Sequence, residues 1–377
     1  MLKKTNIFVL FTFIFLVGCE YESLLSTDVY LRMETSKEMN LDTVPHIVQG
    51  LESVLLFETL DNELLNEFIL PVEEMIVWGT RSIKNGYTGV FGVTGITDGL
   101  WSFPFPENSN ITMFLYILDD ELNLIDAFEI TDKRLINDFH GSDIVYDSGN
   151  WLIYYAGMFS RNIYSYDIKN NETSLFFELN EGIFPSNVQF ISTNQLGFNA
   201  GTGEEGSSIL YYGVIHLETR ALQLFELDAV GFHSGSAVHD YYVLFPAIVT
   251  ADFQAKIIVL DLQTGNYQKI QLDDYESSAA QIIGNGRFIL TRNRDWEKGE
   301  IRTRVYNLYT GDILFQNDTL ISELGLHESE EIVFTEYIML EEGIYAIVNG
   351  IATVAEREVR VEDFRFHVNF IIIEEVE

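Results

Sequence analysis

One hairpin pattern recurs along this sequence and constrains its fold more than any other feature. Each copy has an alternating apolar strand, a turn rich in Asp, Asn, Gly or Thr, and a second strand that ends in apolar and acidic residues. The copies span Leu55–Leu70, Met113–Ile130, Ile163–Leu179, Tyr211–Leu227, Ile257–Leu272 and Thr303–Asp318. Their turns open at Asp61, Asp119, Asp167, His216, Asp261 and Asn307, at intervals of 58, 48, 49, 45 and 46 residues.

Each hairpin is preceded by a further pair of strand-like runs. Between Asp119 and Asp167, for example, lie Asp143–Asp147 and Trp151–Met158. The pattern alternates with period 2 and shows no helical periodicity, which predicts about four short strands in each unit. A repeating four-stranded antiparallel unit of this length is typical of a β-propeller blade. The sequence therefore predicts an all-β chain folded as a β-propeller.

The number of blades follows from the two ends of the repeat array. Further strands at Ile332–Thr335, Gly343–Val348 and Val359–Ile373 predict a seventh blade, and Asp28–Met33 supplies a strand that closes the ring. We expect seven blades within residues 28–377. Because the first interval is long and the last unit irregular, six or eight blades stay open, as do a pair of β-sandwiches and a solenoid.

Two of the turns carry a family resemblance. LDLQTG (Leu260–Gly265) and YNLYTGD (Tyr306–Asp312) resemble the turn motif of quinoprotein-type propellers, in which Asp and Thr-Gly brace the last hairpin of a blade. That family includes propeller lipoproteins of the outer-membrane protein assembly machinery, so the resemblance implies the fold and suggests such a scaffold as one function. The tryptophan usual in its final strand is absent, since the aligned positions are Phe176, Leu224, Gln268 and Phe315.

The N-terminal residues have the form of an export signal. Lys3 and Lys4 precede an apolar run, Ile7–Val17, of about 11 residues, whereas a membrane-spanning helix needs about 20. The tetrad LVGC that ends at Cys19 resembles the lipobox of bacterial lipoproteins. The alternatives are an ordinary signal peptide and an uncleaved anchor.

The resemblance to a lipobox has consequences for location. It implies that residues 1–18 are removed, that Cys19 carries a covalent lipid, and that residues 19–27 tether the propeller to a membrane outside the cytoplasm, in the periplasm or at the cell surface. Cys19 is the only cysteine in the 377 residues, so it cannot form an intramolecular disulfide. We expect no other cofactor.

Composition restricts the class of partner. The formal net charge is −36, which repels phosphate backbones and argues against nucleic-acid binding. A hydrophobic fraction of 47% excludes a disordered chain, and an aromatic fraction of 14% favours strands. The remaining partners are the membrane, reached through the lipid, and a protein, peptide or glycan.

A small polar cluster recurs where each innermost strand is expected to begin. The clusters are FHGSD, FPSN, FHSGS, YESS and LHES, which bring His140, His233, Glu276 and His327 to one mouth of the predicted channel, with Pro185 at the fifth equivalent position. Three imidazoles and a carboxylate can bind a transition metal or a small anionic ligand. Alternatively, these side chains cap strand ends and turns.

Basic residues concentrate in one hairpin, at Arg287, Arg292, Arg294, Lys298, Arg302 and Arg304. In so acidic a chain this patch would receive an acidic partner or a carboxylate ligand. The alternative is pairing with Asp295, Glu297 and Glu300 across the same hairpin. Paired carboxylates such as Asp119–Asp120 are expected at turns, where water solvates them.

The sequence contains no phosphate loop, nucleophile elbow, HExxH or CxxC motif, so no catalytic residue is assigned. The leading interpretation is a membrane-tethered module that binds a protein, peptide or glycan. The second is a binding or hydrolytic site for a small molecule or metal at the channel mouth. The third is a scaffold for outer-membrane protein assembly.

Overall fold

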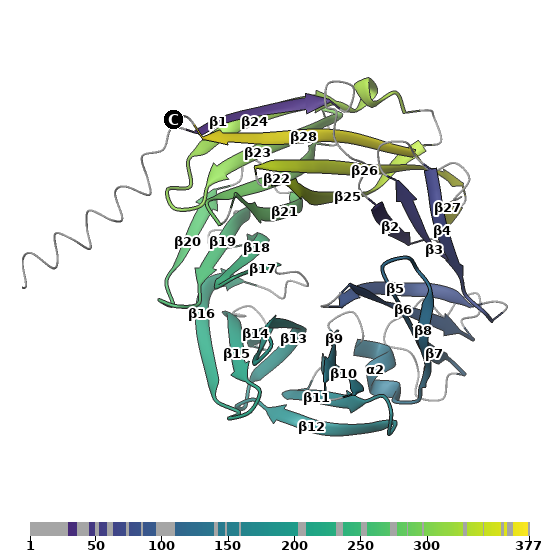
Figure 1. Cartoon of the computed structure of the whole chain (residues 1–377). Coiled ribbons are helices and arrows are strands. Elements are labelled where there is room, and N and C mark those ends of the chain that lie inside the picture. The colour runs from purple at the N-terminus through teal and green to yellow at the C-terminus, as the bar shows by residue number, and fades with distance from the viewer. Residues whose placement is uncertain are drawn as a thin grey trace, which may run out of the picture.

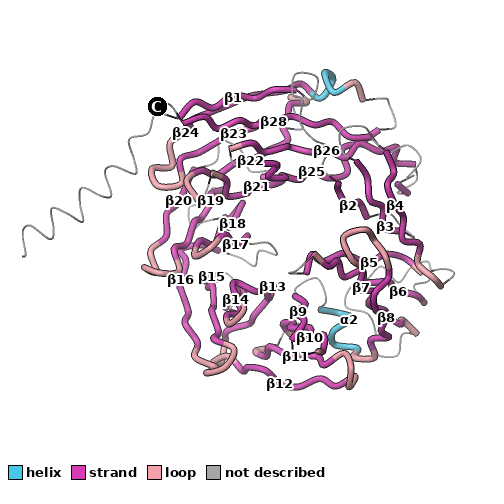
Figure 2. The backbone as a smooth tube through the Cα atoms, in the orientation of Figure 1, coloured by secondary structure: helices cyan, strands magenta, loops and turns pink. Residues whose placement is uncertain are grey.

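The computed structural model of the chain is almost entirely β-sheet (Figure 2). It describes residues 29–35, 45–49, 53–58, 63–72, 75–83, 86–95, 110–138, 142–147, 149–157, 160–202, 209–230, 237–249, 255–271, 277–284, 286–295, 298–326, 330–341, 343–355, 358–359 and 365–375.

The sheets follow one another around a common centre, which confirms the predicted β-propeller (Figure 1). Blade 1 has the described strands β2 (Pro45–Gln49), β3 (Ser53–Glu58) and β4 (Glu63–Ile69). Blade 2 has β5 (Ile76–Ile83), β6 (Tyr87–Thr94), β7 (Thr112–Leu118) and β8 (Leu124–Ile130). Blade 3 has β9 (Ser142–Asp147), β10 (Asn150–Ala156), β11 (Asn162–Asp167) and β12 (Glu172–Glu178).

The second half of the ring repeats this order. Blade 4 has β13 (Ile183–Ser192), β14 (Gln195–Thr202), β15 (Ile209–His216) and β16 (Leu222–Val230). Blade 5 has β17 (Ala237–His239), β18 (Tyr242–Val249), β19 (Ala255–Asp261) and β20 (Tyr267–Gln271), and a single residue pair, Val230↔Val249, joins it to blade 4. Blade 6 has β21 (Ser277–Ile283), β22 (Phe288–Asp295), β23 (Glu300–Asn307) and β24 (Ile313–Leu320).

Blade 7 is built from both ends of the chain. It contains β25 (Glu330–Glu341), β26 (Ile344–Ala355) and β28 (Arg365–Glu375), and the short β27 (Glu358–Val359) pairs with β26. Its outermost strand is β1 (Val29–Thr35), which pairs antiparallel with β28 from Val29↔Glu375 to Thr35↔Asn369. The N-terminal strand therefore closes the ring, as the sequence predicts, and the blades number seven.

Strand alternation builds the core, because successive side chains of a buried strand point to opposite neighbours. In β18, Tyr242 and Leu244 pack toward blade 6, whereas Val243 and Phe245 pack toward blade 4. Buried clusters of this kind lie at the six junctions from blade 1–2 to blade 6–7. Each fully buried large apolar side chain contributes about 1.5–3 kcal/mol relative to an exposed one.

The residues that open the outer hairpins brace their own turns. Asp261 accepts hydrogen bonds from Gln263 N at 2.8 Å and from Thr264 Oγ1 at 2.9 Å. Asn307 Oδ1 accepts from Tyr309 N at 2.8 Å and Thr310 N at 3.0 Å. In both turns a glycine follows in the left-handed region, with φ of 74° at Gly265 and 75° at Gly311, a conformation that glycine adopts without steric cost. These are the bracing contacts expected of Asp or Asn with Thr-Gly.

Helices are short in the described part of the chain. They include α2 (Lys133–Asp138), between blades 2 and 3, and the 3-10 turn η2 (Ile321–Leu324), after blade 6. Neither these nor any other helix among the described residues has the length and apolar character needed to cross a bilayer.

Candidate functional site

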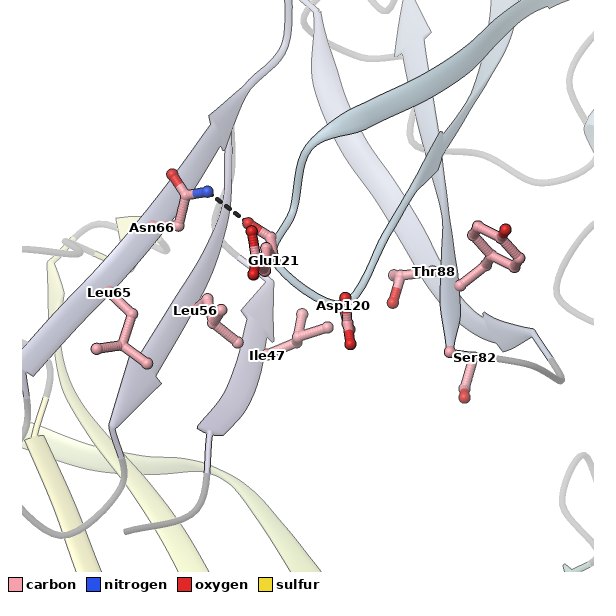
Figure 3. A pocket seen from close by; sticks show the side chains of 10 residues that line it. Ile47, Leu56, Leu65, Asn66, Ser82, Thr88, Asp120 and Glu121 are labelled. Atoms are coloured by element: carbon pink, nitrogen blue, oxygen red, sulfur yellow. Dashed lines mark hydrogen bonds between the residues drawn. The ribbon is translucent and has the colours of Figure 1, made fainter.

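A pocket of about 610 Å³ lies between blades 1 and 2 (Figure 3). It is on the face of the ring that carries the β5–β6 and β7–β8 turns, which we call the turn face. Its volume falls within the range of about 300–1,000 Å³ typical of ligand sites. The lining residues are Ile47, Leu56, Leu65, Asn66, Ser82, Gly86, Tyr87, Thr88, Asp120 and Glu121.

The two walls of the pocket differ in chemistry. Blade 1 contributes the aliphatic side chains of Ile47 and Leu56, and Leu65 lies at the rim. Blade 2 contributes hydroxyl groups and two exposed carboxylates, Asp120 and Glu121. No Lys, Arg or His is among the lining residues that the structure describes. The described lining therefore combines an apolar wall with two negative charges.

The β7–β8 turn holds the two carboxylates in place. Asp119 Oδ1 accepts hydrogen bonds from Glu121 N at 3.0 Å and from Asn123 N at 2.8 Å, and Oδ2 accepts from Asn123 Nδ2 at 3.1 Å. The hydrogen bonds from the Asn123 side chain and backbone lower the pKa of Asp119. Asp119 is ionised and satisfied within the turn, and Glu121 Oε2 also accepts from Asn123 Nδ2 at 3.3 Å. The exposed carboxylates of Asp120 and Glu121 line the pocket.

Two further contacts fix the turn against the blades. Leu122 has φ of 62° and a nearly fully buried side chain, which packs into the core shared by blades 1 and 2. A left-handed conformation is costly for leucine, so its burial compensates for backbone strain. From blade 1, Asn66 Nδ2 donates a hydrogen bond to the backbone carbonyl of Glu121. The acidic turn is thus attached to both walls of the pocket.

The predicted metal or anion ligands His140, His233, Glu276 and His327 lie outside the described residues. The strands that they precede, β9, β17, β21 and β25, are the inner strands of their blades, as the repeat predicts. Pro185, at the fifth equivalent position, lies inside β13. No group of three or more His, Cys, Asp or Glu side chains is placed to hold a metal in the part of the chain that the structure describes. The ring of four residues stays a prediction.

The basic patch is only partly what the sequence predicts. Arg302 and Arg304 are buried, with 9% and 6% of their surface exposed, so these two side chains do not present an open basic surface. Residues 301–306 of β23 are buried on both faces of the strand. Arg302 lies 3.8 Å from the Glu300 carboxylate, which is one of the pairings within the hairpin that the sequence left open as the alternative. Arg304 pairs instead with Asp318 of β24 at 2.5 Å, a partner that the sequence analysis did not name.

The other members of the patch are placed differently. Arg287 stacks on Phe288, with 5.3 Å from its guanidinium carbon to the ring centroid, and donates to the Gly284 carbonyl at 3.3 Å. Lys298 is exposed in the β22–β23 turn. Arg292 and Arg294 lie on β22, and their side chains are outside the described part of the structure.

The sequence pattern predicts Asp119–Asp120 as a solvated pair at a turn, so it gives no role to Asp120 or Glu121. The run DDELN at residues 119–123 contains a detectable signal. Asp119 and Asn123 can satisfy each other within a turn, which leaves the two intervening acids without a structural task. What the run does not reveal is the pocket beside it, because the opposite wall comes from blade 1.

Known proteins resemble this chain in structure alone. Scans of the sequence against models of protein families and against curated proteins gave no match. A chain of the Mitotic Checkpoint Complex is similar with a TM-score of 0.48 at 9% identity, over 92% of this chain and 93% of that chain. Hydrazine synthase of Kuenenia stuttgartiensis gives 0.44 at 12% identity, over 72% and 78%. The β-propeller domain of the Trilobed protease from Pyrococcus furiosus gives 0.34 at 12% identity, over 53% and 58%. The propeller assignment itself rests on the strand pairing within this chain.

Proposed function

We propose that the chain is a binding module tethered to a membrane outside the cytoplasm, and that its pocket between blades 1 and 2 binds a basic segment of a protein or peptide partner. The observation that carries the proposal is the lining of the pocket. Two carboxylates from one braced turn lie opposite an aliphatic wall, and none of the described lining residues is cationic.

Lysine and arginine side chains match this arrangement. Each has an apolar stem that packs along aliphatic surface and a charged head that prefers a carboxylate. Ile47 and Leu56 would contact the stem, and Asp120 with Glu121 would receive the head. The net charge of −36 also favours encounter with a basic partner and disfavours an acidic one.

Preorganisation supports the same conclusion. Ordering a flexible loop during binding costs about 0.5–1.5 kcal/mol for each side chain that becomes fixed. Here the turn is already held by Asp119, Leu122 and Asn66. A partner would therefore meet carboxylates whose backbone positions are set before it arrives.

A binding assay with the purified full chain in detergent tests the pocket. We expect a short Lys/Arg-containing peptide to bind in a salt-dependent manner, and the double variant Asp120→Asn/Glu121→Gln to bind about tenfold or more weakly. Leu65→Trp, which fills the rim, should weaken binding as well. Glu218→Gln removes an exposed acid from the equivalent turn of blade 4 and is the matched control. Equal affinity for wild type and the double variant would refute this role of the pocket.

Site-specific cross-linking identifies the partner in its native cell. A photoreactive residue in place of Ser82, at the pocket, should capture one dominant protein, and the capture should decline when Asp120→Asn/Glu121→Gln is present. The same residue in place of the exposed Leu175 on β12 is the control. Capture that is equal at both positions would mean that contact is not directed by the pocket.

The tether rests on the lipobox-like tetrad that ends at Cys19, which lies outside the described residues. We expect Cys19→Ser to abolish incorporation of a labelled fatty acid and to release the protein from the membrane fraction. Full membrane retention of this variant, without label, would point to an uncleaved anchor instead.

A further inference from the structure

A second cluster lies on the turn face, at the junction of blades 5 and 6. Tyr241 is in the β17–β18 turn, Tyr242 begins β18, and Tyr309 is in the β23–β24 turn. The rings of Tyr241 and Tyr242 have centroids 4.4 Å apart and are tilted by 43°. Three tyrosines from two blades therefore meet at one point, which we call the tyrosine cluster.

One tyrosine of the cluster is buried, and the other two are partly exposed at the surface. Tyr242 is buried, and its hydroxyl shares hydrogen bonds with Tyr241 and Tyr309. Burial, followed by these hydrogen bonds, raises the pKa of Tyr242, so its hydroxyl stays protonated and uncharged. Tyr241 and Tyr309 are 36% and 42% exposed. The buried tyrosine thus holds two rings in place at the surface.

A carboxylate lies in the same turn as Tyr241. Asp240 immediately precedes Tyr241, has φ of 51°, and its side chain is 75% exposed. His239 Nε2 lies 4.0 Å from Asp240 Oδ2, too far for a hydrogen bond. Arg287, in the neighbouring blade, contacts Phe288 and the Gly284 carbonyl. Asp240 is therefore accessible to a charge from outside the molecule.

We propose that Asp240 with Tyr241 and Tyr309 forms a second binding site, for an arginine side chain of a peptide or protein. A guanidinium is planar and stacks on aromatic rings while it pairs with a carboxylate through two parallel hydrogen bonds. Asp240 and Tyr241 offer these two kinds of partner at adjacent positions of one turn, and the charge of the whole chain disfavours an anionic ligand. A lysine would keep the charge attraction but lose the planar stacking.

The position of the cluster strengthens the assignment. Both this site and the pocket lie on the turn face, each at a junction where the two turns of one blade approach the preceding blade. The sites occupy equivalent places in the repeat but belong to different junctions. The cluster can bind its ligand whether or not the pocket does, so the two assignments fail or succeed separately.

Binding of a short peptide that carries arginine, lysine or citrulline at one position, measured with the full chain in detergent, tests the proposal. Citrulline has the shape of arginine without its charge. We expect the arginine peptide to bind most tightly, the lysine peptide more weakly, and the citrulline peptide about tenfold or more weakly than arginine. Citrulline binding equal to arginine binding would overturn the proposal.

Variants separate the cluster from the pocket. Tyr309→Ala should weaken arginine-peptide binding about tenfold, Tyr309→Phe should preserve most of it because the ring remains, and Asp240→Asn should weaken it. Tyr146→Ala removes a comparably exposed tyrosine of blade 3 and is the matched control. The Asp120→Asn/Glu121→Gln variant should still bind the arginine peptide more tightly than the citrulline peptide. Adding Tyr309→Ala to this variant should remove that preference for arginine. If the Tyr309 and Asp240 variants bind like wild type, or if neutral oligosaccharides bind in place of arginine, the assignment is wrong.

Discussion

Blade 2 meets its two neighbours in different ways. Toward blade 3, polar side chains cross the junction at its outer side: Trp151 Nε1 donates to Asp126 at 3.2 Å, and the Tyr155 hydroxyl donates to Asp132 at 3.0 Å. Toward blade 1, the junction contains the acidic pocket of about 610 Å³. Blade 2 therefore has a junction crossed by polar contacts on one side and a junction that contains a pocket on the other.

Both junctions also have an apolar core of buried side chains, which includes Leu115 between blades 2 and 3 and Val54 between blades 1 and 2. Strand alternation is the same in both. The difference teaches that the propeller repeat provides each junction, whereas individual side chains, such as Asp132 and Trp151, decide whether polar contacts cross it.

The largest expected effect is on the free energy of unfolding, when the same Leu→Ala substitution is made at each of the two junctions. Leu115 is fully buried between blades 2 and 3, and Leu56 lines the pocket. We expect Leu115→Ala to lower the free energy of unfolding by about 3–4 kcal/mol and Leu56→Ala by about half as much, since water already reaches the site of Leu56. Denaturant titration of both variants measures this, and equal losses would contradict the comparison.

The next largest effect on stability is expected at Asp132, whose side chain is only 11% exposed. It accepts hydrogen bonds from Arg134 at 3.1 Å and from Thr173 and Tyr155, so it joins the α2 region to blade 3. We expect Asp132→Asn to destabilise the protein by about 1.5–3 kcal/mol near neutral pH, because charged hydrogen bonds are lost. The free energy of unfolding is again the measurement, and Asp120→Asn serves as the exposed control.

The stability that Asp132 provides depends on pH. Burial raises the pKa of Asp132, but hydrogen bonds from Arg134 and Thr173 outweigh it, and the net pKa is lowered. The native carboxylate then holds its proton less tightly than the unfolded one, whose pKa is about 3.9. Its contribution is present above that pH and declines as the pH falls through the native pKa. In Asp132→Asn the loss of stability below about pH 4 should be smaller than in wild type, and identical pH profiles would contradict this role.

A smaller effect is expected from Asp119→Ala, which removes the brace of the acidic turn. The turn is exposed, so we expect a lower thermal midpoint with a shift smaller than that of Asp132→Asn. Affinity for a basic peptide should fall more noticeably, since Asp120 and Glu121 lose their fixed backbone positions. A variant that binds as tightly as wild type would show that preorganisation of the turn does not contribute.

The smallest effect is expected from Glu121→Gln. An exposed side chain with no part in the core should change the free energy of unfolding by no more than about 0.5 kcal/mol. Peptide affinity should nevertheless decline. If this variant loses stability on the scale of Asp132→Asn, the carboxylate supports the junction, and the contrast between the two sides of blade 2 is weaker than we propose.

The sequence alone determined the repeat and the fold that it builds. Alternating apolar residues decide which side chains of a strand face each neighbouring blade, and Asp or Asn at the turn openings decides where each hairpin reverses. Both signals are local, so they can be identified without coordinates. The closing strand at residues 29–35 could be anticipated because a ring of such blades needs a partner for its last strand.

Only the tertiary structure decided the candidate sites. Asn66 and Glu121 are 55 residues apart and meet because blades 1 and 2 are adjacent, and Tyr241 meets Tyr309 across blades 5 and 6 for the same reason. Arg302 and Arg304 look like surface charges in the sequence, yet the orientation of β23 buries them beside their own carboxylate partners. Hydrophobic periodicity specifies which face of a strand is buried, but which side chains meet at a junction depends on how neighbouring blades pack.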